Sequence, residues 1–215
     1  MSQEENQESG HLWEPPLQED KIEASEALKA LLPKLETGGK ALVPGYRPYD
    51  TVELAYVTRK TIGLATTTEA GERAKDFEEK LKNIHTYRDL NHNAEKCKRL
   101  EFRAESFFKQ QDKFDLIWDY AYFCAIEPKW HKQWAQTIER ILEPTGQLAI
   151  FLWPHDKPKG GNYPPYSAEI HDINQLLQPY GFACLEKVKL DDGGTVALYR
   201  RPGACPEFPP SGPFR

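Results

Sequence analysis

The sequence predicts an α/β fold built on a seven-stranded, mostly parallel sheet with helices on both faces. Two observations support this fold class. Short apolar segments typical of buried strands alternate with segments of helical periodicity, an order typical of parallel strands joined by helices. The last two strand segments are instead joined by the sequence Asp-Asp-Gly-Gly at 191–194, which predicts a terminal antiparallel hairpin.

The apolar segments predict the strands, and the segments of helical periodicity predict the helices. Apolar residues recur every three or four positions from Ile22 to Leu35, which predicts a first helix ended by the glycine pair 38–39. The seven predicted strands are residues 41–44, 61–65, 100–104, 115–119, 147–153, 183–190 and 195–200. The further predicted helices are residues 49–56, 68–82, 128–142 and about 167–179.

Length and composition predict one soluble domain with short tails. A chain of 215 residues, of which 39% are hydrophobic and 28% charged, can bury a sizeable core. We expect a single domain at residues 12–201. The polar, acidic stretch 1–11 is expected to be disordered, and the proline-rich stretch 202–215 is expected to form an irregular C-terminal tail.

Charge and cysteine usage narrow the function classes. A net charge of −5 argues against sequence-independent binding to nucleic acid, which needs a positive surface. No apolar run approaches the roughly 20 residues that cross a bilayer. The first twenty residues hold six acids and no Lys or Arg, unlike a signal or transit peptide. We therefore expect a cytoplasmic protein with no nucleic-acid or membrane partner, and the sequence leaves its oligomeric state open. The four cysteines are scattered, which predicts neither a metal site nor a disulfide framework.

The segment ALVPGYRPYD, residues 41–50, has the layout of a nucleotide-binding loop. An apolar strand runs into a turn at Gly45 and then into a helical pattern, which presents backbone N–H groups to a cofactor. Such a loop usually carries further glycines, but Tyr46, Arg47 and Pro48 stand in those places. Two of these residues add bulk and the third lacks a backbone donor. The sequence therefore predicts a cofactor loop that is blocked.

Two longer segments carry a resemblance to a known family. The segment FDLIWDYAYFCAIEPKWHKQWAQTIERILEPTGQLAIFLWP, residues 114–154, is similar to the fourth-strand to fifth-strand region of the thiol and halide methyltransferases. That group is similar to thiopurine S-methyltransferase. The segment GGNYPPYSAEIHDINQLLQPYGF, residues 160–182, resembles the group's Gly-Gly-Pro-Pro-Tyr segment and the helix after it. The resemblance implies a Rossmann-like class I methyltransferase fold, S-adenosylmethionine as cofactor and a small organic substrate.

The chain departs from the family pattern at three cofactor-anchoring positions. The first turn keeps Gly45 but is one residue shorter than the family's Leu-Val-Pro-Gly-Cys-Gly-x-Gly-Tyr-Asp. Ala65 stands where the family has the acid that hydrogen-bonds the ribose hydroxyls, and Ser106 where an acid faces the adenine amine. Charge-assisted hydrogen bonds contribute roughly 1.5–3 kcal/mol each, so these losses predict an affinity lower by about two to four powers of ten.

We therefore predict an enzyme that has lost methyl transfer and uses no cofactor. Its reaction would be a rearrangement of a small organic molecule, a cyclisation or isomerisation in specialised metabolism, accelerated by orientation and polarisation. An alternative is a true S-adenosylmethionine-dependent methyltransferase with an atypical donor site, acting on a thiol, halide or similar soft nucleophile. A third hypothesis is a catalytically inactive protein that binds a partner.

Five residues are predicted to act in catalysis. Asp119 and Tyr122 lie at or just past the fourth strand, where ligands bind in folds of this kind. Asp119 could instead cap the turn that follows. His155 precedes a carboxylate residue and could serve as a general acid or base. Tyr163 and Tyr166 flank two prolines, and either phenol could donate a hydrogen bond to a substrate carbonyl.

Six residues are predicted to line the substrate pocket. They are Trp13, Tyr46, Arg47, Tyr120, Phe123 and Trp153. Trp13 resembles an aromatic residue of the family's N-terminal segment that closes over the donor site. The Arg47 guanidinium could occupy the cofactor cavity, bind an anionic ligand or point to solvent. His131 stands where the resemblance places an arginine that helps to hold or cover the substrate region.

Overall fold

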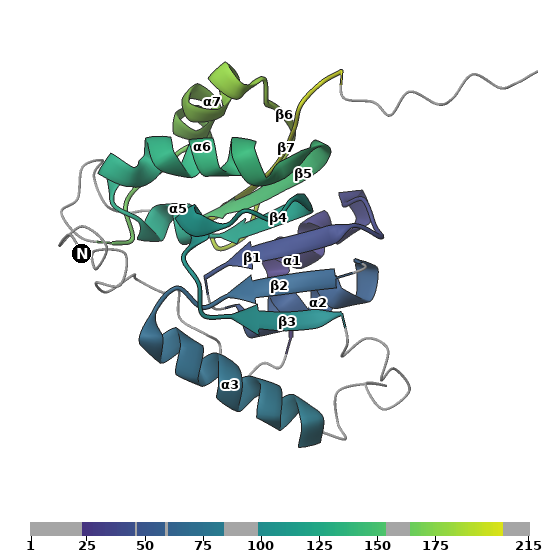
Figure 1. Cartoon of the computed structure of the whole chain (residues 1–215). Coiled ribbons are helices and arrows are strands. Elements are labelled where there is room, and N and C mark those ends of the chain that lie inside the picture. Colours follow the sequence, from purple (N-terminus) through teal and green to yellow (C-terminus); the bar gives the residue numbers. More distant parts are fainter. Residues whose placement is uncertain (1–22, 46, 59, 84–98, 154–163, 204–215) are drawn as a thin grey trace, which may run out of the picture.

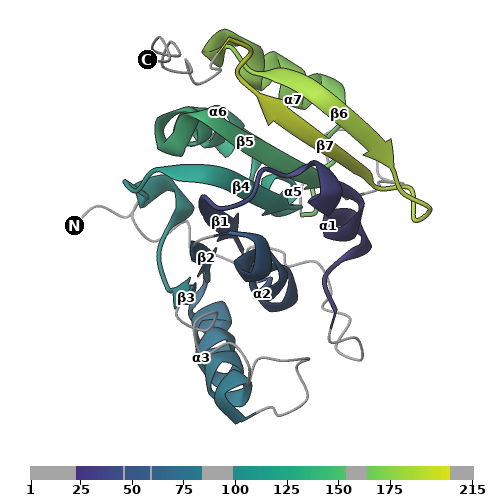
Figure 2. The same ribbon diagram turned by 90° about the vertical axis from the view of Figure 1, so that its right-hand side faces the viewer.

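A seven-stranded sheet runs through the centre of the molecule, with helices on both faces (Figures 1 and 2). The computed structural model of the chain describes residues 23–45, 47–58, 60–83, 99–153 and 164–203. The strands are β1 Lys40–Pro44, β2 Lys60–Leu64, β3 Leu100–Arg103, β4 Phe114–Tyr120, β5 Leu142–Leu152, β6 Ala183–Lys189 and β7 Thr195–Arg200. Their order across the sheet is β3-β2-β1-β4-β5-β7-β6.

Strand directions confirm the predicted fold class. The pairs β1–β2, β2–β3, β1–β4 and β4–β5 are parallel. Strand β7 is antiparallel to both of its neighbours, β5 and β6. The turn between β6 and β7 is closed by a hydrogen bond from Leu190 N to Gly194 O at 2.9 Å. Gly193 has a φ of 86°, a backbone conformation that favours glycine.

Six α-helices are described, and most fall close to a predicted segment. They are α1 Glu26–Leu31, α2 Pro48–Val57, α3 Thr68–Asn83, α5 Tyr122–Ala125, α6 His131–Ile141 and α7 Ile170–Leu177. Helix α1 is shorter than predicted because the chain continues as the 3₁₀ turn η2 Leu32–Lys34, which contains a proline. The Ser25 hydroxyl caps α1 by accepting a hydrogen bond from Leu28 N at 3.1 Å. Helices α1 and α2 cover one face of the sheet, and α6 and α7 the other (Figure 1).

The apolar core consists of a large cluster and a small one. The large cluster lies around the central strands and includes Trp118 and Trp134, both fully buried. The small cluster contains Phe77 of α3 and, directly after β2, Ala65. Ala65 is only 3% exposed. The predicted position of the ribose-binding acid is therefore packed among apolar side chains. Among the described residues, no helix combines the length and apolar character needed to cross a membrane.

The predicted tails remain predictions. Stretch 1–11 lies outside the described residues, as does most of 202–215.

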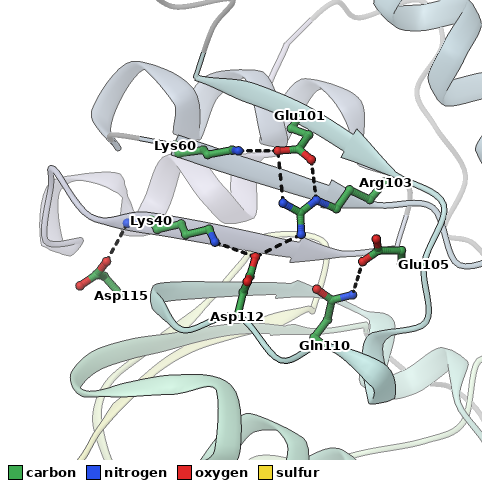
Figure 3. Close-up of polar contacts among 8 residues, drawn as sticks. All are labelled: Lys40, Lys60, Glu101, Arg103, Glu105, Gln110, Asp112 and Asp115. Carbon is green, nitrogen blue, oxygen red and sulfur yellow. Dashed lines mark hydrogen bonds and ion pairs between the residues drawn. The ribbon is translucent and has the colours of Figure 1, made fainter.

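An ion-pair network crosses strands β1, β2 and β3 (Figure 3). Glu101 of β3 contacts Lys60 Nζ at 2.5 Å and Arg103 Nε at 2.6 Å. Arg103 also contacts Asp112 Oδ2 at 3.1 Å, and Lys40 Nζ reaches the same oxygen at 2.7 Å. The network links the outer strand β3 to the centre of the sheet.

We expect the free energy of unfolding of Glu101→Gln to change less with pH in the acid range than that of the wild type. The hydrogen bond from Arg103 is the largest cause that lowers the pKa of Glu101, from 4.5 to about 2. The folded state thus binds this proton less readily than the unfolded state. The stabilisation is present above about pH 4.5 and is lost as the pH falls towards 2. Urea denaturation at several pH values should give the variant a shallower slope in this range. Glu72→Gln on the exposed side of α3 is the control, and equal slopes for Glu101→Gln and the wild type would contradict the expectation.

Candidate functional site

The carboxyl ends of the five parallel strands bring the predicted site residues to one edge of the sheet. Gly45 follows β1, Ala65 follows β2 and Ser106 lies shortly after β3. Tyr120 ends β4, and Trp153 follows β5. Strands β1 and β4 are neighbours in the sheet although two strands separate them in the sequence, so the direction of winding reverses between them. Ligands of open α/β sheets bind outside such a switch point.

Four predicted site residues lie outside the described residues. They are Trp13, Tyr46, His155 and Tyr163. Their predicted roles in catalysis or pocket lining therefore stay predictions.

The turn after β1 keeps an open, glycine-specific conformation. Gly45 has a φ of 81°, which L side chains rarely adopt. A Cβ added to it would have one neighbour within 4 Å, the Cδ2 atom of Tyr122 at 3.7 Å. The first glycine of the predicted cofactor loop is thus present in the backbone geometry that such a loop requires, beside an aromatic ring that follows β4.

Arg47 points inward from the same turn. Its guanidinium carbon lies 3.9 Å from the centroid of the Tyr120 ring, and Nε lies 3.7 Å from Asp50 Oδ2. The side chain is 12% exposed. Nε and Nη1 are buried, and no residue that the structure describes accepts a hydrogen bond from them. Of the three predicted possibilities for Arg47, the solvent-facing one is wrong.

Asp50 anchors this turn to two other elements, and its role was not predicted. Its Oδ1 accepts a hydrogen bond from Ser25 N at 2.7 Å. Its Oδ2 accepts from the Ser25 hydroxyl and from Trp118 Nε1, both at 2.9 Å. The side chain is fully buried. Asp50 therefore ties α2 to the start of α1 and to β4, and its place in the first turn of α2 was the available sequence signal.

Asp119 has the contacts of a structural residue. Its Oδ1 accepts from Phe123 N at 3.1 Å and its Oδ2 from Trp134 Nε1 at 2.9 Å. Burial raises the pKa of Asp119 to about 7, and these hydrogen bonds act in the opposite direction. The arrangement agrees with the alternative in which Asp119 caps the following turn. Its predicted catalytic role stays a prediction.

The turn between β4 and α5 is strained. Ala121 has a φ of 57°, and it donates a hydrogen bond from N to Phe151 O at 2.9 Å. Left-handed conformations are uncommon for residues with a side chain and tend to cluster at functional sites. This turn sets the direction in which Tyr122 and Phe123 leave the sheet edge.

Aromatic rings form two groups behind this edge. Tyr120 stacks on Phe151 at 4.6 Å between ring centroids, and Phe151 meets Trp153 edge-on at 5.9 Å. Tyr122 packs edge-on against Phe107 at 5.2 Å. These pairs give the edge a rigid apolar floor.

Phe123, predicted to line the pocket, has no exposed surface. It stacks on His131 at 3.9 Å and meets Trp134 edge-on at 4.8 Å. Burial lowers the pKa of His131, while backbone hydrogen bonds at Ile126 and Phe123 act in the opposite direction. Phe123 therefore belongs to the apolar core behind the edge.

Three further described candidates are Tyr166, Ser106 and His131. Tyr166 is buried and donates from its backbone N to Cys124 O at 2.7 Å, and burial raises the pKa of its phenol. Its predicted catalytic role stays a prediction. In the described part of the chain, Ser106 Oγ and His131 Nε2 are buried without a hydrogen-bond partner. Such atoms are rare in folded proteins, so each is a candidate for contact with a ligand.

The sheet order, the single antiparallel strand and the edge formed by β1 and β4 define a class I methyltransferase fold. Within that class, the chain belongs to the thiopurine S-methyltransferase family, which it matches over residues 14–193.

Curated relatives and solved structures agree with this assignment. The chain is 36% identical over 161 residues to a probable thiol methyltransferase 2 of Arabidopsis thaliana, a match covering 72% of the chain and 65% of that protein. It is 35% identical over 147 residues to thiocyanate methyltransferase 1 of Brassica oleracea, which covers 67% of the chain and 58% of that protein. The chain thus spans less than two thirds of the length of these relatives.

The structural likeness extends over nearly the whole domain. The N-methyltransferase NodS of Bradyrhizobium japonicum WM9, in complex with S-adenosyl-L-homocysteine, superposes with a TM-score of 0.61 at 15% identity, covering 93% of this chain and 97% of NodS. CcbJ methyltransferase of Streptomyces caelestis gives 0.63 at 11% identity, covering 83% and 90%. At these identities the likeness is one of fold.

The family assignment overturns two predictions. The chain is not supported as a cofactor-independent cyclase or isomerase, because the family and its curated relatives are named as methyltransferases. The prediction that no cofactor is used is wrong for the same reason. Both predictions rested on the groups lost at the anchor positions. Among the described residues, the turn at Gly45 nevertheless stays open, and Arg47 and Ser106 carry buried polar atoms without partners.

The described residues fit S-adenosylmethionine, with fewer charged contacts than the family pattern implies. The open turn at Gly45 leaves room for close approach, and Ser106 Oγ is free to bond a polar group. Ala65 instead packs with apolar residues such as Val52 and Phe77, so no carboxylate faces a ribose there. The fit predicts that the ribose and adenine of the cofactor are held more by shape and neutral hydrogen bonds than by charge.

Proposed function

We propose that the protein is an S-adenosylmethionine-dependent methyltransferase whose acceptor is a soft sulfur nucleophile, a thiol or thiocyanate. The observation that carries this proposal is the open, left-handed turn at Gly45, which lies beside Tyr122. This turn stands at the switch point of the sheet in a chain that belongs to the thiopurine S-methyltransferase family. The names of the plant relatives support the choice of a sulfur acceptor.

The chemistry requires little of the chain beyond positioning. When bound, S-adenosylmethionine supplies an electrophilic methyl group. A free thiol has a pKa near 8.5 and is partly ionised at neutral pH, and thiocyanate is already an anion, so the acceptor needs no general base. This agrees with Asp119, whose two oxygens are both engaged by donors within the protein.

The aromatic edge would supply orientation and exclusion of water. Tyr120 and Trp153 are joined through Phe151, and Tyr122 is held by Phe107. Rigid apolar walls keep a polarisable sulfur close to its reaction partner and remove competing water. On the cofactor side, the Gly45 turn and the Ser106 hydroxyl would hold the donor.

Methyl transfer tests the proposal directly. The purified full chain is incubated with methyl-labelled S-adenosylmethionine and either thiocyanate or thiophenol, and the methylated product is identified by gas chromatography and mass spectrometry. We expect label in the methylated sulfur compound and binding of S-adenosylhomocysteine in calorimetry. Absence of both product and binding would overturn the proposal.

We expect Gly45→Val to reduce methyl transfer about 10- to 100-fold, because it misplaces the turn by a fraction of an ångström to an ångström. A β-branched residue at a φ of 81° is strained, and its side chain extends towards Tyr122. Gly181→Val is the matched control, since Gly181 has a φ of 77° with nothing within 4 Å of an added Cβ and lies after α7. Both variants should lose similar stability, and only Gly45→Val should lose activity at a temperature where both are folded. Equal activity in the two would contradict the role of the turn.

A further inference from the structure

We propose that Arg47 binds an anionic group of a methyl-transfer ligand, at the carboxyl end of β1. This inference rests on the proposed function and adds a residue to it. The family pattern has a small glycine turn at this point, so the arginine gives this chain a contact of its own.

Arg47 carries several N–H donors at this turn. A guanidinium carries five N–H groups, of which one is on Nε and two are on Nη1. Both of these nitrogens are buried and have no acceptor within residues 23–45, 47–58, 60–83, 99–153 and 164–203. The side chain nevertheless keeps 12% of its surface exposed, so it lies at the margin of the protein interior. Buried donors without partners are costly, and charged ones more so, which favours an acceptor that arrives with a ligand.

The neighbouring carboxylate, Asp50, already accepts hydrogen bonds from other residues. Its Oδ2 already accepts hydrogen bonds from the Ser25 hydroxyl and Trp118 Nε1, and lies 3.7 Å from Arg47 Nε. At this distance it offsets part of the charge of Arg47 but accepts no hydrogen bond from it. The Asp50 carboxylate therefore stabilises a buried guanidinium and leaves its donors unused.

An aromatic ring holds the Arg47 guanidinium in position. Its carbon lies 3.9 Å from the centroid of the Tyr120 ring, which is itself stacked on Phe151 at 4.6 Å. A cation held against an aromatic face in a partly buried place is stabilised without using its N–H groups. The donors are thus held in place next to the open turn at Gly45.

The ligand chemistry that matches these features is an anion with hydrogen-bond acceptors. A carboxylate satisfies the planar donors of arginine best. Two sources are available within the proposed reaction. One is the amino-acid carboxylate of the cofactor, and the other is an anionic acceptor such as thiocyanate.

Calorimetry with two matched ligands separates these sources. S-adenosylhomocysteine and its decarboxylated analogue, S-adenosyl-3-thiopropylamine, are titrated into the wild type, Arg47→Gln and Arg47→Lys. If Arg47 holds the cofactor carboxylate, the wild type should bind the analogue about 10- to 100-fold more weakly than S-adenosylhomocysteine. Arg47→Gln should weaken S-adenosylhomocysteine by a similar factor and leave the analogue unchanged, with part of the affinity kept in Arg47→Lys. Lys187→Gln, on the exposed side of β6, is the control for loss of one positive charge.

A thiocyanate titration, followed by calorimetry, completes the test. If thiocyanate is the anion, Arg47→Gln should weaken thiocyanate binding and leave both nucleoside ligands unchanged. Two results would overturn the inference. In the first, Arg47→Gln binds S-adenosylhomocysteine and thiocyanate with the affinities of the wild type. In the second, Arg47→Gln loses the same factor of affinity for both nucleoside ligands, and its affinity for thiocyanate is unchanged. If the wild type binds S-adenosylhomocysteine in either case, the proposed function still stands. If the wild type binds neither S-adenosylhomocysteine nor thiocyanate, the inference and the proposed function are both overturned. The comparison of the two nucleoside ligands on the wild type needs no variant, so a variant that fails to fold does not block it.

Discussion

Replacing Asp50 with Ala should lower the free energy of unfolding by about 3–5 kcal/mol. The change leaves three donors without an acceptor, on Ser25 N, the Ser25 hydroxyl and Trp118 Nε1. It also removes the carboxylate that lies 3.7 Å from Nε of the buried Arg47 guanidinium. Removing one member of a buried charge pair is far more harmful than removing both, because the remaining charge is left in a poorly solvated place.

Urea denaturation of a small variant set measures this effect. Asp50→Asn should cost less than Asp50→Ala, since its amide oxygen can still accept from Trp118 or Ser25. The double variant Asp50→Ala with Arg47→Gln should lose less stability than the sum of its single variants, because the two side chains are neighbours. A loss below about 1 kcal/mol for Asp50→Ala would contradict the anchoring role of the carboxylate.

The fold was predictable because its signals are local. Most of the parallel strands contain a short apolar run, and the turn sequence at 191–194 marks the β6–β7 hairpin. The largest difference concerns β5, which begins at Leu142, five residues before the predicted strand. Helix α5 was not predicted, since a four-residue helix is too short to show a periodicity.

The site was predictable only in part, because its contacts join distant parts of the chain. The edge at Gly45 and Tyr120 followed from the strand order. Asp50 meets Ser25 and Trp118, which lie 25 and 68 residues away, so no local pattern pairs them. The loss of a glycine or an acid does not by itself abolish cofactor binding. The outcome depends on which other donors and acceptors the folded chain places at the site. Arg47 illustrates this, because its bulk counted against a cofactor while its unused donors favour an anionic ligand.

For Asp119, which has a titratable side chain, a catalytic role and a structural role can be separated by experiment. Its carboxylate is a candidate catalytic group by position and a structural group by its contacts with Phe123 N and Trp134 Nε1. We expect Asp119→Ala to lower the free energy of unfolding by about 2–5 kcal/mol, because both buried donors lose their acceptor. The paired change Trp134→Phe removes one of these donors, so the double variant should be less unstable than additivity implies.

The pH dependence of stability separates the two roles further. Burial raises the pKa of Asp119 from 3.8 to about 7, so the folded state binds this proton more readily than the unfolded state. The contribution of Asp119 to stability should therefore be largest below about pH 4 and decline as the pH rises to about 7, with no further change above it. Asp119→Asn removes the titration while keeping one acceptor, so its free energy of unfolding should decline less than that of the wild type across this range. If Asp119 is structural, Asp119→Asn should also retain methyl transfer wherever it is folded. Loss of activity in a fully folded Asn variant would instead assign the carboxylate to catalysis, and an unchanged pH slope would show that the buried group does not titrate there.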